Sequence, residues 1–239
     1  MSFFKNVFAT IVGLFLFILL SFFFLIGLGA LIGSGEDEVK VNDNSVIQLD
    51  LAKINFDYAG KYDSDSPFSS LFLDKDKVGF IEVLNAIDAA KTDDKIKGIT
   101  IVNNESNLGL AQSKELRDKL EDFKKSKKFV LAYATVFSQK EYYISSVADA
   151  IYLNPSGEMD FKGLGTEMLF YKNFQDQTGL KMEIIRHGKF KSAVEPFLAQ
   201  EISKENREQV TVLLQSVWDN IVSDIAKNRN VSVTQLNTI

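Results

Sequence analysis

The first segment of the chain is hydrophobic on every side. No charged residue occurs from Asn6 to Gly35, and the run is dense in Phe, Leu and Ile. About 20 such residues in a helix cross the roughly 30 Å of hydrocarbon in a bilayer. Core helices of soluble proteins are rarely apolar all round for so long. We therefore predict a transmembrane anchor over residues 7–33, after a cytoplasmic N-terminus of residues 1–6.

A cleavable secretory signal is the alternative for this segment. Such a signal has an apolar region of about 7 to 15 residues and then a small-x-small cleavage site. The run here is longer and offers only an ill-defined site near residues 29–35, so we favour an uncleaved anchor. Lys5 lies on its short side and the acidic residues 36–38 on the other. The positive-inside rule then places everything after residue 36 across the membrane.

Beyond a polar linker at residues 34–45, the hydrophobic positions follow strand and helix periods in turn. We expect helices at residues 79–91, 111–128, 138–148, 166–180 and 203–229, and strands at residues 45–58, 97–103, 128–135, 149–153 and 181–188. Residues 59–70 have the composition of a loop, and Asn-Pro-Ser-Gly at 154–157 that of a turn. This alternation predicts an α/β fold with a mainly parallel sheet and covering helices.

Composition removes several function classes. The chain has no cysteine, which excludes disulfides, thiol catalysis and cysteine-ligated zinc. His187 is the single histidine, so a multi-histidine metal site is excluded. The net charge of −5 and pI of about 5.1 argue against general binding of nucleic acid. No metal and no cofactor are expected.

Most other polar features have ordinary interpretations. The lysine cluster at residues 124–128 suits the C-terminal end of a helix. His187 is more simply a polar residue at a strand end than a ligand, and the Gly-Leu-Gly at 163–165 is a weak phosphate-loop signal. Lys191 stands out because it lies in a distinctive string, Gly-Lys-Phe-Lys-Ser-Ala-Val-Glu-Pro-Phe at residues 188–197.

That string, together with Ile-Tyr-Leu-Asn-Pro-Ser-Gly at residues 151–157, resembles the N-terminal half of signal peptide peptidase A in its long two-repeat form. The family's run has Tyr where this chain has Phe190, and Lys191 to Phe197 are unchanged. The resemblance covers nearly the whole chain. It implies a fold like that of the crotonase and Clp-protease superfamily, with a mixed sheet and covering helices. Residues 46–239 would be the N-terminal, lysine-bearing repeat, apparently truncated at its C-terminal end.

The resemblance also implies a serine peptidase with a Ser/Lys dyad, in which Lys191 is the general base and the serine lies beyond Ile239. The degenerate serine loop of this repeat reads Ser-Gln-Lys-Glu-Tyr-Tyr-Ile-Ser from Ser138, and Gln139 falls at the nucleophile position. An amide cannot attack a peptide carbonyl. The counterpart of the family's glycine-rich oxyanion loop, at residues 102–110, lacks the Gly-Gly pair.

Lysine chemistry places demands on the surroundings of Lys191. With a reference pKa of about 10.4, a lysine base needs its pKa lowered by roughly 3 units to act near neutral pH, and burial does this. A carboxylate facing the amine would oppose the shift, so we expect Glu195 to point away, toward a structural partner. A dyad of Lys191 with Ser192 is disfavoured because adjacent side chains diverge, and Ser138 is one position off the nucleophile site.

The sequence thus predicts a membrane-anchored serine endopeptidase that degrades remnant signal peptides. The resemblance further implies a homo-oligomer in the bacterial inner membrane, a single pass, and a catalytic domain on the periplasmic side. One alternative is a catalytically inactive, membrane-tethered binding or assembly module of the same fold. A second is an acyl-CoA activity of the crotonase type, which the anchor and the run from Lys191 to Phe197 fit poorly.

Overall fold

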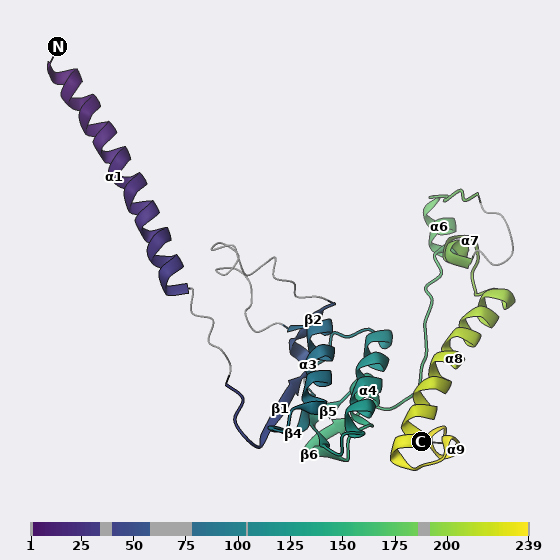
Figure 1. Ribbon diagram of the computed structural model, residues 1–239. Helices are drawn as coiled ribbons and strands as arrows, with labels where there is room; N and C mark the ends of the chain where they lie inside the picture. Colours follow the sequence, from purple (N-terminus) through teal and green to yellow (C-terminus); the bar gives the residue numbers. More distant parts are fainter. Residues whose placement is uncertain (1, 34–39, 58–77, 104, 186–191, 239) are drawn as a thin grey trace.

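A computed structural model describes residues 2–33, 40–57, 78–103, 105–185 and 192–238 of the chain (Figure 1). Its first element is the helix α1, Ser2–Gly33. Within α1, Ser2–Leu28 is long and apolar enough to cross a membrane, and its side chains are exposed to the surroundings in the isolated chain. Length and composition therefore agree with the anchor expected from the sequence.

Four parallel strands form the sheet at the centre of the fold. They are β1 (Ser45–Asp50), β4 (Ile96–Asn103), β5 (Phe129–Phe137) and β6 (Ala150–Met159), in the order β1-β4-β5-β6. Each neighbouring pair is parallel. A 3-10 turn, Leu51–Lys53, leads to β2 (Ile54–Phe56), which pairs in parallel with β3 (Val78–Gly79) in a small second sheet. These strands confirm the predicted α/β class.

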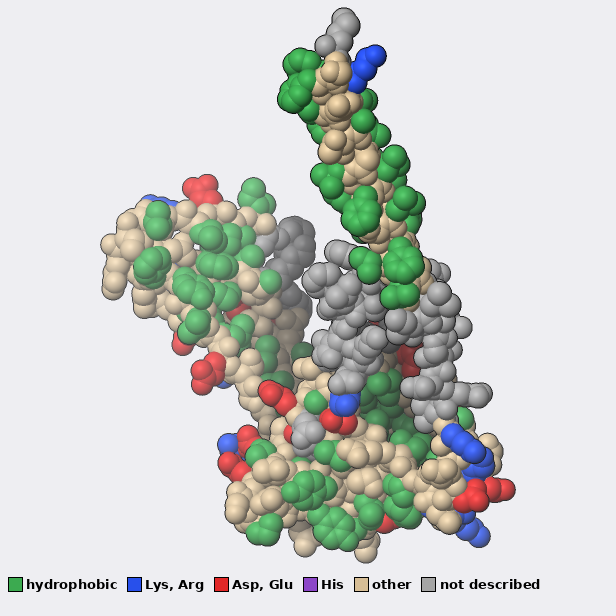
Figure 2. Space-filling view, turned by 90° about the vertical axis from the view of Figure 1, so that its left-hand side faces the viewer, with side chains coloured by type: hydrophobic (Ala, Val, Ile, Leu, Met, Phe, Trp, Pro, Cys, Tyr) green, Lys and Arg blue, Asp and Glu red, His purple; other side chains and the backbone are tan. Residues whose placement is uncertain are grey.

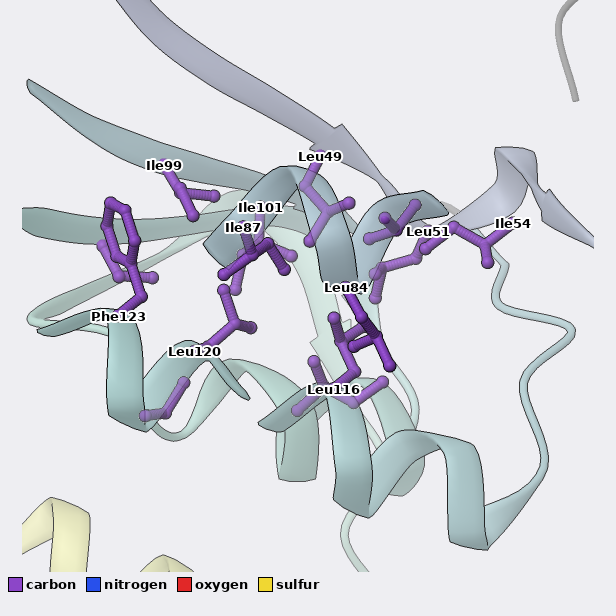
Figure 3. Packing of buried hydrophobic residues seen from close by; sticks show 14 of the residues in the cluster. Leu49, Leu51, Ile54, Leu84, Ile87, Ile99, Ile101, Leu116, Leu120 and Phe123 are labelled. Carbon is purple, nitrogen blue, oxygen red and sulfur yellow. The ribbon is translucent and has the colours of Figure 1, made fainter. Parts of the chain in front are cut away.

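Three helices pack on the sheet and bury the main core. They are α3 (Phe80–Thr92), α4 (Leu110–Lys124) and α5 (Gln139–Ser145). Figure 3 shows Leu84 and Ile87 of α3, and Leu116, Leu120 and Phe123 of α4, pointing toward Ile99 and Ile101 of β4. Spacings of three and four residues put these side chains on one face of each helix. The helical pattern of the sequence therefore identified the covering layer correctly.

The chain after β6 forms an arm that stands beside the sheet and its helices (Figure 1). The arm contains α6 (Lys172–Thr178), a 3-10 turn (Ser192–Val194), α7 (Glu195–Leu198), α8 (Lys204–Arg229) and α9 (Val233–Leu236). Ile221, Val222 and Ile225 of α8 pack with Tyr143 and Leu236 in a second, smaller cluster. The upper arm is the part that holds α6, α7 and the start of α8, and Figure 2 shows exposed apolar side chains over it. Leu169, Phe174 and Leu180 are among the exposed residues in this part of the sequence.

Four local predictions differ from the structure. The strand expected over residues 45–58 is interrupted by the 3-10 turn at Leu51–Lys53, where the Asp50 side chain accepts from Ala52 N. The helix expected over residues 166–180 shortens to α6, because Gly179 ends it in a left-handed conformation and residues 166–171 are not helical. The strand expected over residues 181–188 is absent from its described part, residues 181–185. The last two of these segments lie in the arm, where the described residues offer them no neighbouring strand to pair with.

The turn expected at residues 154–157 is instead a bulge inside β6. Leu153 pairs with Ala134, and the next paired residue, Glu158, faces Val136, so four residues of β6 oppose Thr135 alone. Gly157 makes this possible: a Cβ placed there would lie 2.0 Å from the carbonyl oxygen of Thr135. The sequence correctly indicated an irregular backbone at these residues. The strand resumes after them because Glu158 and Met159 pair again with β5.

Replacing Gly157 by Ala should therefore destabilise the fold, by about 1 to 3 kcal/mol, since the new methyl group must displace backbone. Urea denaturation of the Gly157→Ala variant measures the loss. Gly165→Ala is the matched control, because no atom lies within 4 Å of its Cβ position. Equal stability of the two variants would show that the bulge does not require glycine.

Candidate functional site

The predicted base, Lys191, lies in the segment 186–191, outside the described residues, and His187 lies there as well. The structure describes the two stems that lead into and out of this segment. The incoming stem is residues 179–185, and the outgoing stem is the 3-10 turn Ser192–Val194 followed by α7. Both belong to the upper arm, next to the first turn of α8 (Figure 1). The geometry of the candidate site is therefore built from these stems.

Glu195 secures the outgoing stem. Its side chain is buried, with 4% of the residue exposed. One carboxylate oxygen, Oε1, accepts a hydrogen bond from Ser203 Oγ at 2.5 Å, and Oε2 accepts from Asn206 Nδ2 at 2.9 Å and from Ser203 N at 3.3 Å. The prediction that Glu195 has a structural partner is confirmed. Its orientation relative to the Lys191 amine stays a prediction, because Lys191 is outside the described residues.

Gln175, on α6, connects the two stems. Its Oε1 accepts a hydrogen bond from Met182 N at 2.9 Å, and its Nε2 donates to Phe197 O at 2.8 Å. The ring of Tyr171 stacks on that of Phe197, with centroids 5.5 Å apart, and Tyr171 N donates to Pro196 O. The two stems are thus joined by one side-chain amide, and the outgoing stem is also held by one stacked pair.

The degenerate serine loop is occupied by its own side chains. Ser138 caps α5, because its Oγ accepts from Glu141 N at 3.3 Å, and the Gln139 side-chain oxygen accepts from Gly163 N at 2.8 Å. Glu141 is buried and accepts from Ser138 N and from Ser106 N. These contacts use residues 138–141 to join α5 to the chain on either side of it, and they give Gln139 a structural role.

A lysine side chain binds the backbone of the loop that corresponds to the oxyanion loop. Lys140 Nζ donates to the carbonyl oxygens of Ser106 at 2.6 Å and Leu108 at 2.8 Å. These two hydrogen bonds join the start of α5 to the backbone of residues 106–108. The contacts agree with the inference that this repeat supplies neither the nucleophile nor the oxyanion hole by these routes.

A buried ionic network joins the arm to the covering helices. The Arg117 side chain on α4 is fully buried, its Nη2 donates to Asp224 O at 2.8 Å, and its guanidinium lies 5.3 Å from the ring centre of Tyr143. Tyr143 Oη donates to Asp224 Oδ2 at 2.7 Å. Burial, and then this bond to a carboxylate, raise the pKa of Tyr143, which keeps the phenol a donor.

Glu121 adds a second ionic link between α4 and α8. Lys227 Nζ donates to its Oε1 at 2.5 Å, and Arg117 Nη1 lies 3.4 Å from its Oε2. The hydrogen bond from Lys227 is the main reason that the pKa of Glu121 is lowered, with smaller contributions from both cations. The carboxylate therefore remains ionised near neutral pH and faces the guanidinium as an anion.

Sequence reasoning identified Lys191, Glu195 and the start of α8 at Ser203, but it missed Gln175, Asn206 and Arg117. Gln175 and Asn206 carried no signal, because a single amide in a polar helix is typical of a solvated face. Arg117 carried a weak one: it adjoins Leu116 and lies three residues before Leu120, close to the apolar stripe of α4. Within the described residues, no group of three or more His, Asp or Glu side chains could hold a metal ion.

Replacing Arg117 by Met should cost about 1.5 to 3 kcal/mol of stability, because the half-buried Asp224 and Glu121 lose the charge-assisted contacts of a fully buried guanidinium. Urea denaturation measures this cost. Lys114→Met is the matched control: Lys114 is a more exposed lysine on the same helix, paired with Asp118 and Asp224, and its removal should cost less than about 1 kcal/mol. A similar small loss for both variants would contradict a central role for Arg117.

Comparison with known proteins matches the arm and the adjoining strands. The profile of peptidase family S49 matches residues 122–239. Protease 4 of Haemophilus influenzae is 37% identical over 156 residues, which cover 65% of this chain and 25% of that protein. Protease 4 of Salmonella typhi is 33% identical over 156 residues, with the same coverage. The chloroplastic serine protease SPPA of Arabidopsis thaliana is 28% identical over 137 residues, which are 57% of this chain and 20% of the plant protein.

The matched part of this chain thus spans a quarter or less of the length of these three relatives. The matches nevertheless agree with the resemblance noted from the residues around Lys191, which lies inside the region matched by the family profile. On this evidence residues 122–239 of the chain carry the domain of peptidase family S49, and the chain resembles signal peptide peptidase A.

Proposed function

We propose that this chain is the lysine-bearing part of a membrane-anchored serine endopeptidase. The observation that carries the proposal is the unchanged run from Lys191 to Phe197, which lies inside the region that matches family S49. In this proposal Lys191 is the general base of a Ser/Lys dyad. The serine and the oxyanion hole come from a second repeat, outside residues 1–239, because Gln139 occupies the nucleophile position of this one.

The proposed chemistry is a division of labour between two repeats. The neutral amine of Lys191 takes the proton of the serine hydroxyl as the oxygen attacks the peptide carbonyl, and the resulting ammonium then protonates the leaving amine. For this the amine must be neutral near physiological pH, which burial between two repeats would achieve by disfavouring the charged form. The stems held by Gln175 and Glu195 supply one wall of such a site.

The membrane helix suggests the substrate. The segment Ser2–Leu28 would hold the peptidase at the bilayer, where remnant signal peptides remain after secretion. The charges flanking the helix favour an N-terminus in the cytoplasm. The proposed protein is therefore a single-pass protein of the bacterial inner membrane with its catalytic domain on the periplasmic side, assembled as a homo-oligomer.

A catalytically inactive, membrane-tethered binding module is the second candidate function. The observation that favours it is the filled serine loop, in which Ser138, Gln139 and Lys140 are engaged in hydrogen bonds within the fold. The two candidates differ in one respect that can be measured: only the peptidase needs a serine-bearing partner repeat and a neutral Lys191.

The first test is the intact mass of the protein extracted from its own membranes, compared with the 26.8 kDa of the 239 residues. A mass about twice this value or more is expected, since the second repeat resembles the first in size. A mass near 26.8 kDa, with no partner chain that supplies a serine, would favour the binding module.

The second test is replacement of the proposed base. Lys191→Ala in the native protein should lower kcat/KM on a fluorogenic signal-peptide substrate by about 10² to 10⁴, the usual contribution of a general base. Lys125→Ala is the control, because it removes an exposed lysine at the end of α4, outside both stems, and should leave the rate unchanged. Full activity of Lys191→Ala would refute the assignment.

A further inference from the structure

The carboxylate of Glu195 lies at the N-terminal end of α8, four residues after Lys191. Its three described hydrogen bonds all come from the cap and first turn of α8: Ser203 Oγ, Ser203 N and Asn206 Nδ2. Ser203 is also the N-cap of α8, since its Oγ accepts from Asn206 N at 3.1 Å. The cap of the long helix and the anchor of the outgoing stem are thus one hydrogen-bonded unit, which we name the Glu195 anchor (Glu195, Ser203 and Asn206).

Physical chemistry makes this unit rigid. Hydrogen bonds to an ionised carboxylate are stronger than those between neutral groups, and the N-terminal end of a helix favours a negative charge. Glu195 and Asn206 are both buried, so water does not compete for their polar groups. A buried donor or acceptor left unpaired is costly, which favours the anchored state.

The Glu195 anchor holds the stem that follows Lys191 in one position relative to α8. Glu195 begins α7, and Pro196 restricts the backbone directly after it. From Glu195 the contact runs through α8 to Asp224, which binds the buried Arg117 of α4. The backbone after Lys191 is therefore tied, through one helix, to the core of the fold.

We propose that Glu195 is a positioning residue for the general base. Its carboxylate fixes the outgoing stem on α8 and so sets where the Lys191 amine is presented to the serine-bearing repeat. This inference rests on the proposed function, because it assigns a task to Glu195 only if Lys191 is the base. It goes beyond it by naming the side chains that place the base.

The test compares Glu195→Gln with Glu201→Gln in the native, full-length protein, on the same fluorogenic signal-peptide substrate. Gln keeps the shape of Glu195 but presents an amide group where Ser203 and Asn206 both donate. A displacement of about 1 Å at a catalytic group can reduce a rate about 100-fold. We therefore expect kcat of Glu195→Gln to fall about 10- to 100-fold, with KM changed by less than about twofold. Glu201 is exposed in the connection between α7 and α8, after the end of the stem, and Glu201→Gln should behave like the wild type.

The pH profile separates positioning from simple loss of stability. A lysine base is active when neutral, so the rate rises with pH through its pKa. A misplaced amine is better hydrated, its pKa is less depressed, and the rising limb of kcat should move to higher pH in Glu195→Gln. A variant that was merely less stable would lose amplitude in proportion to its folded fraction, with the limb unmoved. That result would overturn the proposal.

A swapped pair provides the rescue. Asn206→Asp alone places a second carboxylate beside Glu195 and should also lower kcat. In the double variant Glu195→Gln with Asn206→Asp, the residue-195 amide donates to the residue-206 carboxylate, which restores a charged hydrogen bond with its direction reversed. We expect the double variant to recover most of the kcat and the wild-type limb. If the losses of kcat from the two single variants instead add in the double variant, the hydrogen bond between residues 195 and 206 is not what positions the base.

Lys191→Ala in the same assay distinguishes the two levels of inference. If Lys191→Ala retains full activity, the proposed function fails and the positioning role falls with it. If Lys191→Ala is inactive and Glu195→Gln has the wild-type kcat and pH profile, the proposed function stands and only the role of Glu195 is refuted. Loss in both, with the shifted limb and the rescue, is the expected result.

Discussion

The attachment of α8 to the covering helices is the constraint on which the arrangement of this chain depends. Arg117 of α4 brings a permanent charge into the interior, and Asp224 and Glu121 compensate it from two elements. Tyr143 of α5 completes the enclosure, with its ring beside the guanidinium and its hydroxyl on Asp224. Removing Asp224 would leave the buried charge of Arg117 with less compensation, so the contact favours one relative position of α4, α5 and α8.

That position matters because the arm has little core of its own. The main apolar cluster lies between the sheet and α3, α4 and α5, and the second, smaller cluster is centred on the C-terminal half of α8. Aromatic contacts continue from Tyr142 through Phe161 to Trp218, along the path by which the chain leaves the sheet. The upper arm is then held by polar contacts, of which the Glu195 anchor and the Gln175 bridge are the main ones. Apolar packing thus fixes the base of the arm, and directional hydrogen bonds fix its upper end.

The two candidate centres of the repeat contrast in how they use polar groups. At the serine loop, Gln139, Lys140 and Glu141 all form hydrogen bonds within the fold, so the loop has become part of the scaffold. At the Lys191 segment, the polar contacts secure the stems on either side of the segment. In the proposed function, this repeat supplies the base and the stems that support it, and the partner repeat supplies the serine.

The parts of the fold that could be predicted are those that depend on residues close together in the sequence. The helices α3, α4 and α8 were predicted because the spacing of apolar residues along a helix is a local pattern. Residues 166–171 and 181–185 were predicted as regular elements and are not, because only a neighbouring strand or core face could have stabilised them. The bulge at residues 154–157 had the composition of a turn, and the continued pairing with β5 decided that the strand resumes.

By itself, the sequence determined the apolar N-terminal helix, the α/β class, the family and the identity of the proposed base. Each of these depends on composition, on local periodicity or on a contiguous run of residues. The tertiary structure decided that Glu195 binds the start of α8, that Gln175 bridges the two stems, and that Arg117 joins α4 to α8. Their partners are 7 to 107 residues away along the chain. Folding alone brings such side chains together, because a hydrogen bond requires atoms within about 3 Å regardless of their separation in sequence.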